Sequence, residues 1–126
     1  MSERELGIVE SVRLDRECGG ALTMWVSFKF HGSGQGFGGF VLDQYDKAKG
    51  RRVGHAAGLD YILRVMDVFG VERLDDIEGK PAYALRASDK WGESIIGIEA
   101  PEYEGSKRFT IAEWREEWGL GEKVSP

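Results

Sequence analysis

The chain has 126 residues, of which 41% are hydrophobic and 31% charged, and its net charge is −5. We expect one domain spanning residues 1–126, because this length supports a single hydrophobic core. The acidic balance argues against a dedicated nucleic-acid-binding protein, whose surface usually carries a basic excess. A single cysteine cannot form an internal disulfide, which favours a reducing compartment. No apolar run approaches the ~20 residues that cross a bilayer, so we expect a cytoplasmic protein without a membrane partner.

The first half of the chain predicts three antiparallel strands. Residues 6–13 form the first, and residues 21–30 form the clearest, because apolar and polar side chains alternate along them with a period of two. Its even positions should face a core, and its odd positions, Trp25 among them, should face the other way. A third strand at residues 40–42 should pair with the second as a hairpin.

The middle of the chain predicts a loop and then an amphipathic helix. Residues 43–52 are polar and are typical of a loop, after which a helix should run from residue 53 or 54 to residue 69. Gly70 should end this helix in a Schellman-type turn. The apolar stripe of the helix recurs at helical spacing and comprises Leu59, Ile62, Leu63, Met66 and Phe69.

The last part of the chain completes the predicted fold. Residues 71–77 should form a short helical turn, and residues 82–86 and 94–98 a further hairpin. A last helix should begin near Thr110, which has capping-box spacing to Glu113. The apolar face of this helix comprises Ile111, Trp114 and Trp118. These elements predict an α+β fold, an antiparallel sheet of about five strands with a central amphipathic helix and a C-terminal helix packed on it.

Residues 32–39 contain five glycines between two apolar segments, and such a cluster requires a geometric reason. Gly34, Gly36 and Gly39 match the pattern G-x-G-x-x-G, but the run leads into a strand rather than a helix and is therefore no dinucleotide fingerprint. The kinase version of the pattern fails as well, because the other kinase motifs are absent from the sequence. Two interpretations stay open. In the first, the backbone N–H groups of the run bind a phosphate. In the second, which is the commoner case, the glycines relieve crowding in a bulged hairpin.

A second candidate for ligand binding is the basic run of Lys47, Lys49, Arg51 and Arg52, followed by His55. If a helix begins just beyond this run, its side chains lie near the positive end of the helix dipole, where an anion can be held. The alternative is an ordinary solvated loop. The candidate ligand-binding residues of the two segments are Gly34, Gly36, Phe37, Gly38, Gly39, Lys47, Arg51, Arg52 and His55.

Signals for catalysis and for metal binding are weak. His31 and His55 are the only histidines, and neither has a metal-ligand spacing. Cys18 has no neighbouring histidine in the sequence that would activate a thiolate. We therefore expect no catalytic residue, metal or cofactor, and rank a small hydrolase behind the binding functions. Trp25 and Trp91, on the sheet face away from the core, favour a homo-oligomer.

Residues 35–43, with the sequence QGFGGFVLD, resemble a family of small phage and prophage proteins. The recognisable core of that family is a Q-G-F-G-G-[YF]-x-L-D motif after an alternating strand, and the resemblance continues through residues 58–64, 68–71 and 74–80. Similar sequences carry an acidic E-D-H-G turn before the second strand, which residues 16–20 replace here. The resemblance implies a phage or prophage origin and no assigned activity.

Our leading hypothesis is a non-enzymatic accessory binding protein of phage or prophage origin that captures an anionic small molecule such as a nucleotide signal. In it the backbone of residues 36–39 supplies donors, Arg51 and Arg52 pair with phosphate, and Phe37 or Trp91 stacks on a base. The alternative is a protein–protein interaction module that inhibits or adapts a host or virion protein without a small-molecule ligand. Such a module would bind through tryptophan and phenylalanine side chains and ignore the basic run.

Overall fold

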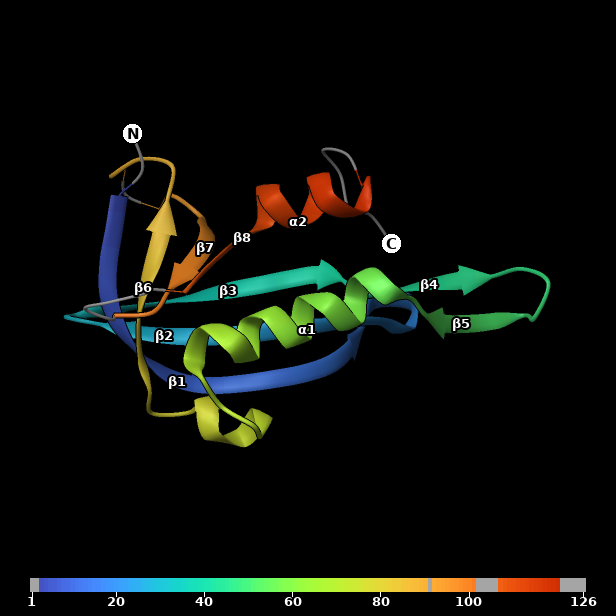
Figure 1. Cartoon of the computed structure of the whole chain (residues 1–126), viewed down its shortest axis with the longest axis horizontal. Coiled ribbons are helices and arrows are strands. Elements are labelled where there is room, and N and C mark those ends of the chain that lie inside the picture. The colour runs from blue at the N-terminus through green and yellow to red at the C-terminus, as the bar shows by residue number, and fades with distance from the viewer. Residues whose placement is uncertain (1–2, 91, 102–106, 121–126) are drawn as a thin grey trace.

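The computed structural model describes residues 3–90, 92–101 and 107–120, and it shows a strongly bent antiparallel sheet with two helices against it (Figure 1). Six strands form the main sheet in the order β3-β2-β1-β6-β7-β8, and β4 and β5 form a separate hairpin. The strands are β1 (Glu3–Glu17), β2 (Ala21–Phe30), β3 (Ser33–Val41), β4 (Asp43–Asp46), β5 (Arg51–Gly54), β6 (Pro81–Arg86), β7 (Ile95–Glu99) and β8 (Arg108–Thr110). The α-helices are α1 (Ala56–Phe69) and α2 (Ile111–Trp118), and the short 3-10 helices are η1 (Cys18–Gly20) and η2 (Leu74–Ile77).

The bend of the sheet originates in β1, because this strand does not keep both neighbours along its whole length. β2 pairs with β1 from Ile8 to Glu17, whereas β6 pairs only with the segment from Glu3 to Ile8. A β-bulge between Val9 and Ser11 adds local twist near the change of neighbour. The sheet therefore curls, and β3 comes to contact β7 although three strands separate them in the hydrogen-bonded order.

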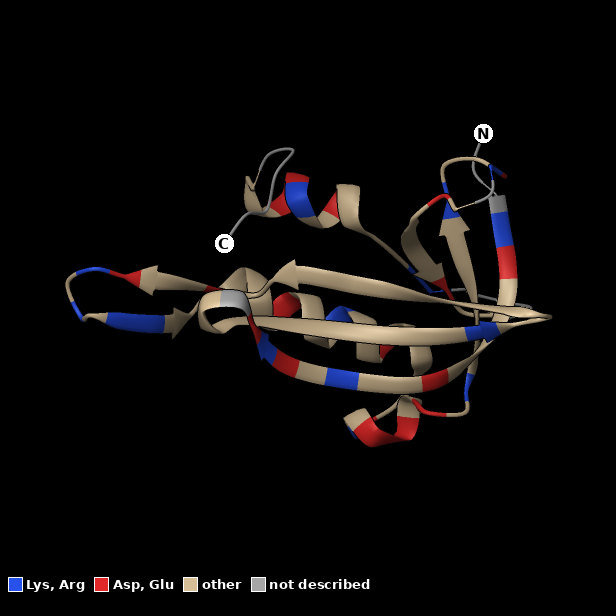
Figure 2. Cartoon of the chain, turned by 180° about the vertical axis from the view of Figure 1, so that it is seen from behind, with Lys and Arg blue, Asp and Glu red and all other residues tan. Residues whose placement is uncertain are grey.

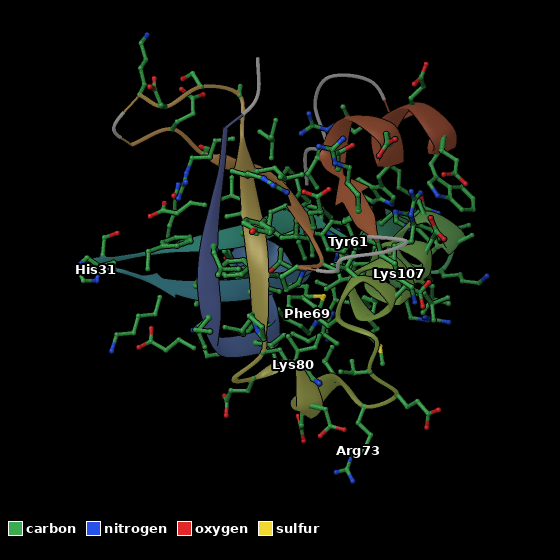
Figure 3. The ribbon with its side chains drawn as sticks, turned by 60° about the vertical axis from the view of Figure 1, so that its left-hand side comes forward. His31, Tyr61, Phe69, Arg73, Lys80 and Lys107 are labelled. Carbon is green, nitrogen blue, oxygen red and sulfur yellow. The ribbon has the colours of Figure 1, made fainter. Side chains whose placement is uncertain are left out.

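An aromatic cluster fills the space between the sheet and the helices. Tyr61 on α1 lies at its centre, with its ring centroid 6.3 Å from that of Phe37 and 5.1 Å from that of Phe109. The ring of Trp114 on α2 lies 5.1 Å from Tyr61 on another side, and its Nε1 donates to Ala57 O at 2.8 Å. Figure 3 shows Tyr61 between the helix and the sheet. One aromatic side chain thus joins β3, β8 and both helices.

The predicted α+β fold is confirmed, with six strands in the main sheet rather than about five. The strand at residues 21–30 and the hairpin near residues 82–98 form as predicted. The predicted loop at residues 43–52 is wrong, because β4 and β5 pair there. A tight turn connects them, with Gly50 N donating to Asp46 O at 2.9 Å and Gly50 at a φ of +67°. The third strand begins at Ser33 rather than at residue 40, so most of the glycine run lies within β3.

The predicted apolar stripe of α1 is wrong at two of its positions. Leu59 and Leu63 are 66% and 59% exposed, whereas Val65 is completely buried. The helix is rotated so that its core face holds Ala57, Gly58, Tyr61, Val65, Val68 and Phe69. Ile62 and Met66 are only partly buried beside this face. The packing of the Tyr61 ring therefore sets which face of α1 is buried, and the predicted stripe of large apolar side chains does not.

Both helix ends that the sequence marked are confirmed. Gly70 adopts a left-handed conformation with a φ of 66°, and Val71 N donates to Met66 O at 3.2 Å, which makes the Schellman turn. Thr110 caps α2 by accepting from Glu113 N at 3.3 Å. The prediction for Trp118 is wrong, because this side chain is 38% exposed and does not lie with Ile111 and Trp114 in the core.

Replacement of Gly58 by alanine should destabilise the protein, although alanine is the better helix former by about 1 kcal/mol. A Cβ on Gly58 would overlap the backbone carbonyl of Leu42, so the helix has to move away from the sheet. We expect Gly58→Ala to lower the free energy of unfolding by about 2–4 kcal/mol in urea titrations. Gly54→Ala is the control, because a Cβ there meets open space, and it should change stability by less than about 0.5 kcal/mol. Equal stability of the two variants would contradict the packing of α1 described above.

Candidate functional site

The glycine run in β3 provides the surface on which Trp25 of β2 lies. A Cβ at Gly36 would lie 3.0 Å from the indole Cε3 of Trp25, and one at Gly39 would overlap the opposite edge of the same six-membered ring, at Cζ2. Trp25 is opposite Gly38 in the β2–β3 pairing and lies on the sheet face away from the core, as the alternation predicted. These contacts support the structural interpretation of the run, in which small residues make room for a large neighbour.

Gly38 and Gly39 also form an irregularity in the ladder, where the register of β2 shifts between Thr23 and Trp25. Their φ angles are +133° and +82°, a region that side chains with a Cβ avoid. A Cβ at Gly38 would in addition overlap the carbonyl oxygen of Met24. The backbone here is therefore shaped by strand pairing.

Glu17 fixes the indole of Trp25 from the end of β1. Its Oε2 accepts from Trp25 Nε1 at 2.8 Å and from the hydroxyl of Thr23. The hydrogen bond from Thr23, followed by that from Trp25, lowers the pKa of this carboxyl. The carboxylate thus holds the indole flat over the glycines of β3.

The basic run lies on the β4–β5 hairpin, which projects from the end of the molecule (Figures 1 and 2). Lys47 and Arg51 are exposed there. Arg52 is already paired, because its Nε and Nη2 donate to the two oxygens of Asp43 at 3.0 and 2.9 Å. Asp43 Oδ1 accepts a further hydrogen bond from Leu22 N at 3.0 Å. The hydrogen bonds from Arg52 hold the pKa of Asp43 below its usual value.

Other predicted site residues have structural partners too. The Nδ1 of His55 accepts from Gly58 N at 3.0 Å and so caps α1. Phe37 is 1% exposed and belongs to the aromatic core, so it offers no free face for stacking. Trp91 lies outside the described residues. Figure 1 places the start of β3 at the opposite end of the molecule from the β4–β5 hairpin. The end of β3, which carries Gly38 and Gly39, leads into that hairpin, so only the start of the glycine run is remote from the basic run.

A cavity of about 530 Å³ lies instead at the end of the sheet where β1, β3 and the β6–β7 loop meet. Of the predicted site residues, only Gly34 lines it. Most of the residues that line it have polar side chains, and three of them are basic: Arg4, Glu5, Ser33, Gly34, Gln35, Arg86, Ser88, Asp89, Lys90 and Gly92.

Arg86, at the end of β6, is the most firmly held of these basic side chains. Its Nε and Nη2 donate to Gln35 Oε1 at 3.0 and 2.6 Å, and its Nη1 donates to Glu5 Oε1 at 3.0 Å. The guanidinium carbon also lies 5.0 Å from the ring centroid of Phe30. Arginine has five N–H donors, so two of them have no partner in these three hydrogen bonds.

Gln35 connects β3 to the β6–β7 loop and so closes one wall of the cavity. Its Nε2 donates to Glu93 O at 2.8 Å, while its Oε1 accepts from Arg86. In the same loop, Ser88 Oγ donates to Glu93 Oε1 at 2.8 Å and accepts from Lys90 N at 3.3 Å. These hydrogen bonds organise the described part of the loop.

Sequence reasoning missed Arg4, Arg86 and Lys90, because they lie in three separate segments and join only when the sheet bends. One signal was available. Gln35 opens the QGFGGFVLD motif as its only polar side chain before the aspartate, and a polar residue inside a glycine-rich strand needs a partner.

Comparison of the chain with models of protein families, with curated proteins and with solved structures finds no match. No helix within the described ranges is long and apolar enough to span a membrane. Within the same ranges, no group of three or more histidine, cysteine, aspartate or glutamate residues is placed to hold a metal ion.

The Asp43–Arg52 pair should stabilise the protein in a pH-dependent way. Because the folded-state pKa of Asp43 is lowered, its contribution is fully present above roughly pH 4 and is lost as the pH falls through the folded-state value. We expect Asp43→Asn to cost about 1–3 kcal/mol of unfolding free energy at neutral pH. The difference from the unmodified protein should shrink when thermal unfolding is measured at about pH 3.

Asp67→Asn is the control for this experiment, since Asp67 is exposed on α1 and makes no ion pair among the described residues. It should change stability by less than about 0.5 kcal/mol at either pH. A destabilisation by Asp43→Asn that is the same at both pH values would show that the charge of Asp43 is not what matters.

Proposed function

We propose that this protein is a non-enzymatic binding protein that captures a small phosphate-bearing anion in the cavity between β1, β3 and the β6–β7 loop. The observation that carries the proposal is the convergence of Arg4, Arg86 and Lys90 on one cavity of about 530 Å³. That volume is in the range of small-molecule sites and suits a ligand of nucleotide size.

The fixed position of the Arg86 guanidinium favours an anionic ligand. Gln35, Glu5 and the ring of Phe30 fix the guanidinium, so its two remaining N–H donors are oriented before binding. A fixed arginine fork suits the oxygens of a phosphate group, and little side-chain entropy is lost when the ligand binds. Ser33 and Ser88 line the same cavity and add neutral hydrogen-bonding groups.

The balance of charge in the cavity also favours an anion. The 3.0 Å ion pair between Glu5 and Arg86 cancels one charge of each sign. Among the other lining residues, one acidic group, Asp89, stands against two basic groups, Arg4 and Lys90. Arg4 Nη1 contacts Glu99 at 3.2 Å and its guanidinium carbon lies 4.2 Å from the ring centroid of Tyr83, while 58% of its side chain is exposed at the cavity. Lys90 is exposed on the loop.

The lining supports binding rather than catalysis. It contains no histidine or cysteine among the described residues, and because Glu5 is engaged by Arg86, Asp89 is the remaining carboxylate. A mechanism that pairs a general acid with a general base would need a second such group. This proposal keeps the leading hypothesis of an anionic ligand such as a nucleotide signal, and it moves the site from the β4–β5 hairpin to the opposite end of the molecule.

Replacement of Lys90 by glutamate should weaken ligand binding without affecting the fold. We propose thermal-shift screening with nucleoside phosphates, cyclic mononucleotides, cyclic dinucleotides and inorganic phosphate, followed by calorimetric titration of the ligand that gives the largest shift. Lys90→Glu and Arg4→Glu should each raise the Kd by about tenfold or more, which is the loss of one charge-assisted hydrogen bond.

Lys49→Glu is the matched control, because it makes the same change in net charge on the exposed β4–β5 turn. It should leave the Kd within about twofold. If no compound in the panel shifts the melting temperature of the folded protein, the small-molecule proposal is wrong and the protein–protein alternative takes its place. An equal loss of affinity in Lys49→Glu would contradict the location of the site.

A further inference from the structure

The second half of β1 forms an edge of the main sheet. Residues from Ser11 to Glu17 pair with β2 on one side, and among the described residues no strand pairs with them on the other, since β6 pairs only up to Ile8. Val9 is the last residue with a backbone partner on that side, through Gly79 N at 2.8 Å and Lys80 O at 2.9 Å. Along these seven residues, the backbone N–H and C=O groups of every second residue, those not directed at β2, are therefore available to another strand.

This edge is apolar on the face that carries the helices. Val12 and Leu14 lie opposite Val26 and Met24 of β2, and both β2 residues are 1% exposed in the core. Directly opposed residues share one face of a sheet, so Val12 and Leu14 extend the core face to the edge. Leu14 is nevertheless 42% exposed. The core is thus incomplete along β1.

Helix α1 adds two more uncovered side chains on the same side of the sheet. Leu59 and Leu63 are 66% and 59% exposed and are one helical turn apart. The neighbouring residues Asp60 and Arg64 contact α2, through Trp118 Nε1 at 2.9 Å and Glu117 Oε1 at 2.6 Å. Leu59 and Leu63 therefore belong to the part of α1 that α2 does not cover.

We propose that the β1 edge pairs with the β1 edge of a second copy of this chain, antiparallel and about a two-fold axis at Leu14. Such an isologous contact joins the two sheets into one and satisfies the free backbone groups of both copies. Both α1 helices then lie on the same face of the joined sheet. The two Leu14 side chains meet at its centre.

The charges of β1 select this register. When two copies of a strand pair antiparallel about a two-fold axis, directly opposed side chains lie on the same face of the sheet only if the axis passes through a residue and not between two residues. In this edge, the residues nearest the middle are Arg13, Leu14 and Asp15. A centre at Arg13 opposes two arginines, and a centre at Asp15 opposes two aspartates. A centre at Leu14 places Arg13 of each copy opposite Asp15 of the other. Within one chain these two side chains already meet at 3.3 Å and are 61% and 45% exposed, so they are free to exchange partners.

This self-complementary pattern distinguishes a second copy from an unrelated peptide. A foreign strand would have to supply its own acidic and basic residues at the two positions, whereas a copy of this chain brings them in the required order. The proposal is independent of the anion cavity, which is lined by Arg4, Glu5 and other residues beyond the bulge.

The test is a set of charge reversals in the full chain, measured by native mass spectrometry and by sedimentation at micromolar concentration. The unmodified protein should have twice the 14.1 kDa mass of the chain. Arg13→Asp places aspartates opposite each other at both ends of the contact, and Asp15→Arg does the same with arginines. Each single variant should raise the dimer Kd by about tenfold or more through like-charge repulsion.

Two rescues separate this pairing from general damage to the surface. The double variant Arg13→Asp/Asp15→Arg restores opposite charges and should dimerise again. An equimolar mixture of the two single variants should form a heterodimer, because each then meets its complement at both positions. Asp46→Arg on the β4–β5 hairpin is the control and should dimerise like the unmodified protein, and thermal unfolding verifies that every variant is folded.

Any one of three results would overturn the proposal. The first is that the unmodified protein is a monomer, and the second is that the single variants dimerise as well as the unmodified protein. The third is that neither the double variant nor the mixture of single variants regains the dimer.

Discussion

The structure depends on one constraint in β1, a strand whose first part pairs with β6 on one side and whose second part pairs with β2 on the other. Its first residues, from Glu3 to Gly7, pair with β6 alone, Ile8 pairs with both β6 and β2, and its last seven residues pair with β2 alone. Since the same strand carries the bulge between Val9 and Ser11, the sheet has to bend at this point. The bend closes the sheet around Tyr61, and both helices are positioned by contact with that side chain and its aromatic neighbours.

The two ends of β1 have opposite consequences. At its start the curled sheet brings Gln35 of β3 within hydrogen-bonding distance of Arg86 on β6, and the cavity that we propose to bind an anion lies beside this contact. At its end the sheet has not curled far enough to cover Leu14, and an edge stays open. The residues proposed to bind a ligand and those proposed to bind a second copy are therefore separated along one strand, so that each function can be altered without the other.

Local patterns in the sequence were sufficient for elements whose partners lie nearby in the chain. The alternation of residues 21–30 and the capping residues Gly70 and Thr110 gave the correct strand and helix ends, because period and backbone conformation are local properties. The orientation of α1 was not accessible in this way. Leu59 and Leu63 fit a helical stripe as well as the buried residues do, and only the position of Tyr61 against β3 and β8 decides which face is covered. The site was missed for the same reason, since Arg4, Arg86 and Lys90 come together only through the bend.

The QGFGGFVLD segment shows how a motif can owe most of its residues to the fold. Gly36 and Gly39 make room for Trp25, Gly38 adopts a backbone conformation that its neighbours require, and Phe37 is part of the core. These roles explain the glycine run without a ligand. Gln35 differs, because its amide is directed to Arg86 and Glu93 at the wall of a cavity and not into the apolar interior. This amide is therefore the part of the motif that packing alone does not explain, and it holds the Arg86 guanidinium at the wall of the cavity.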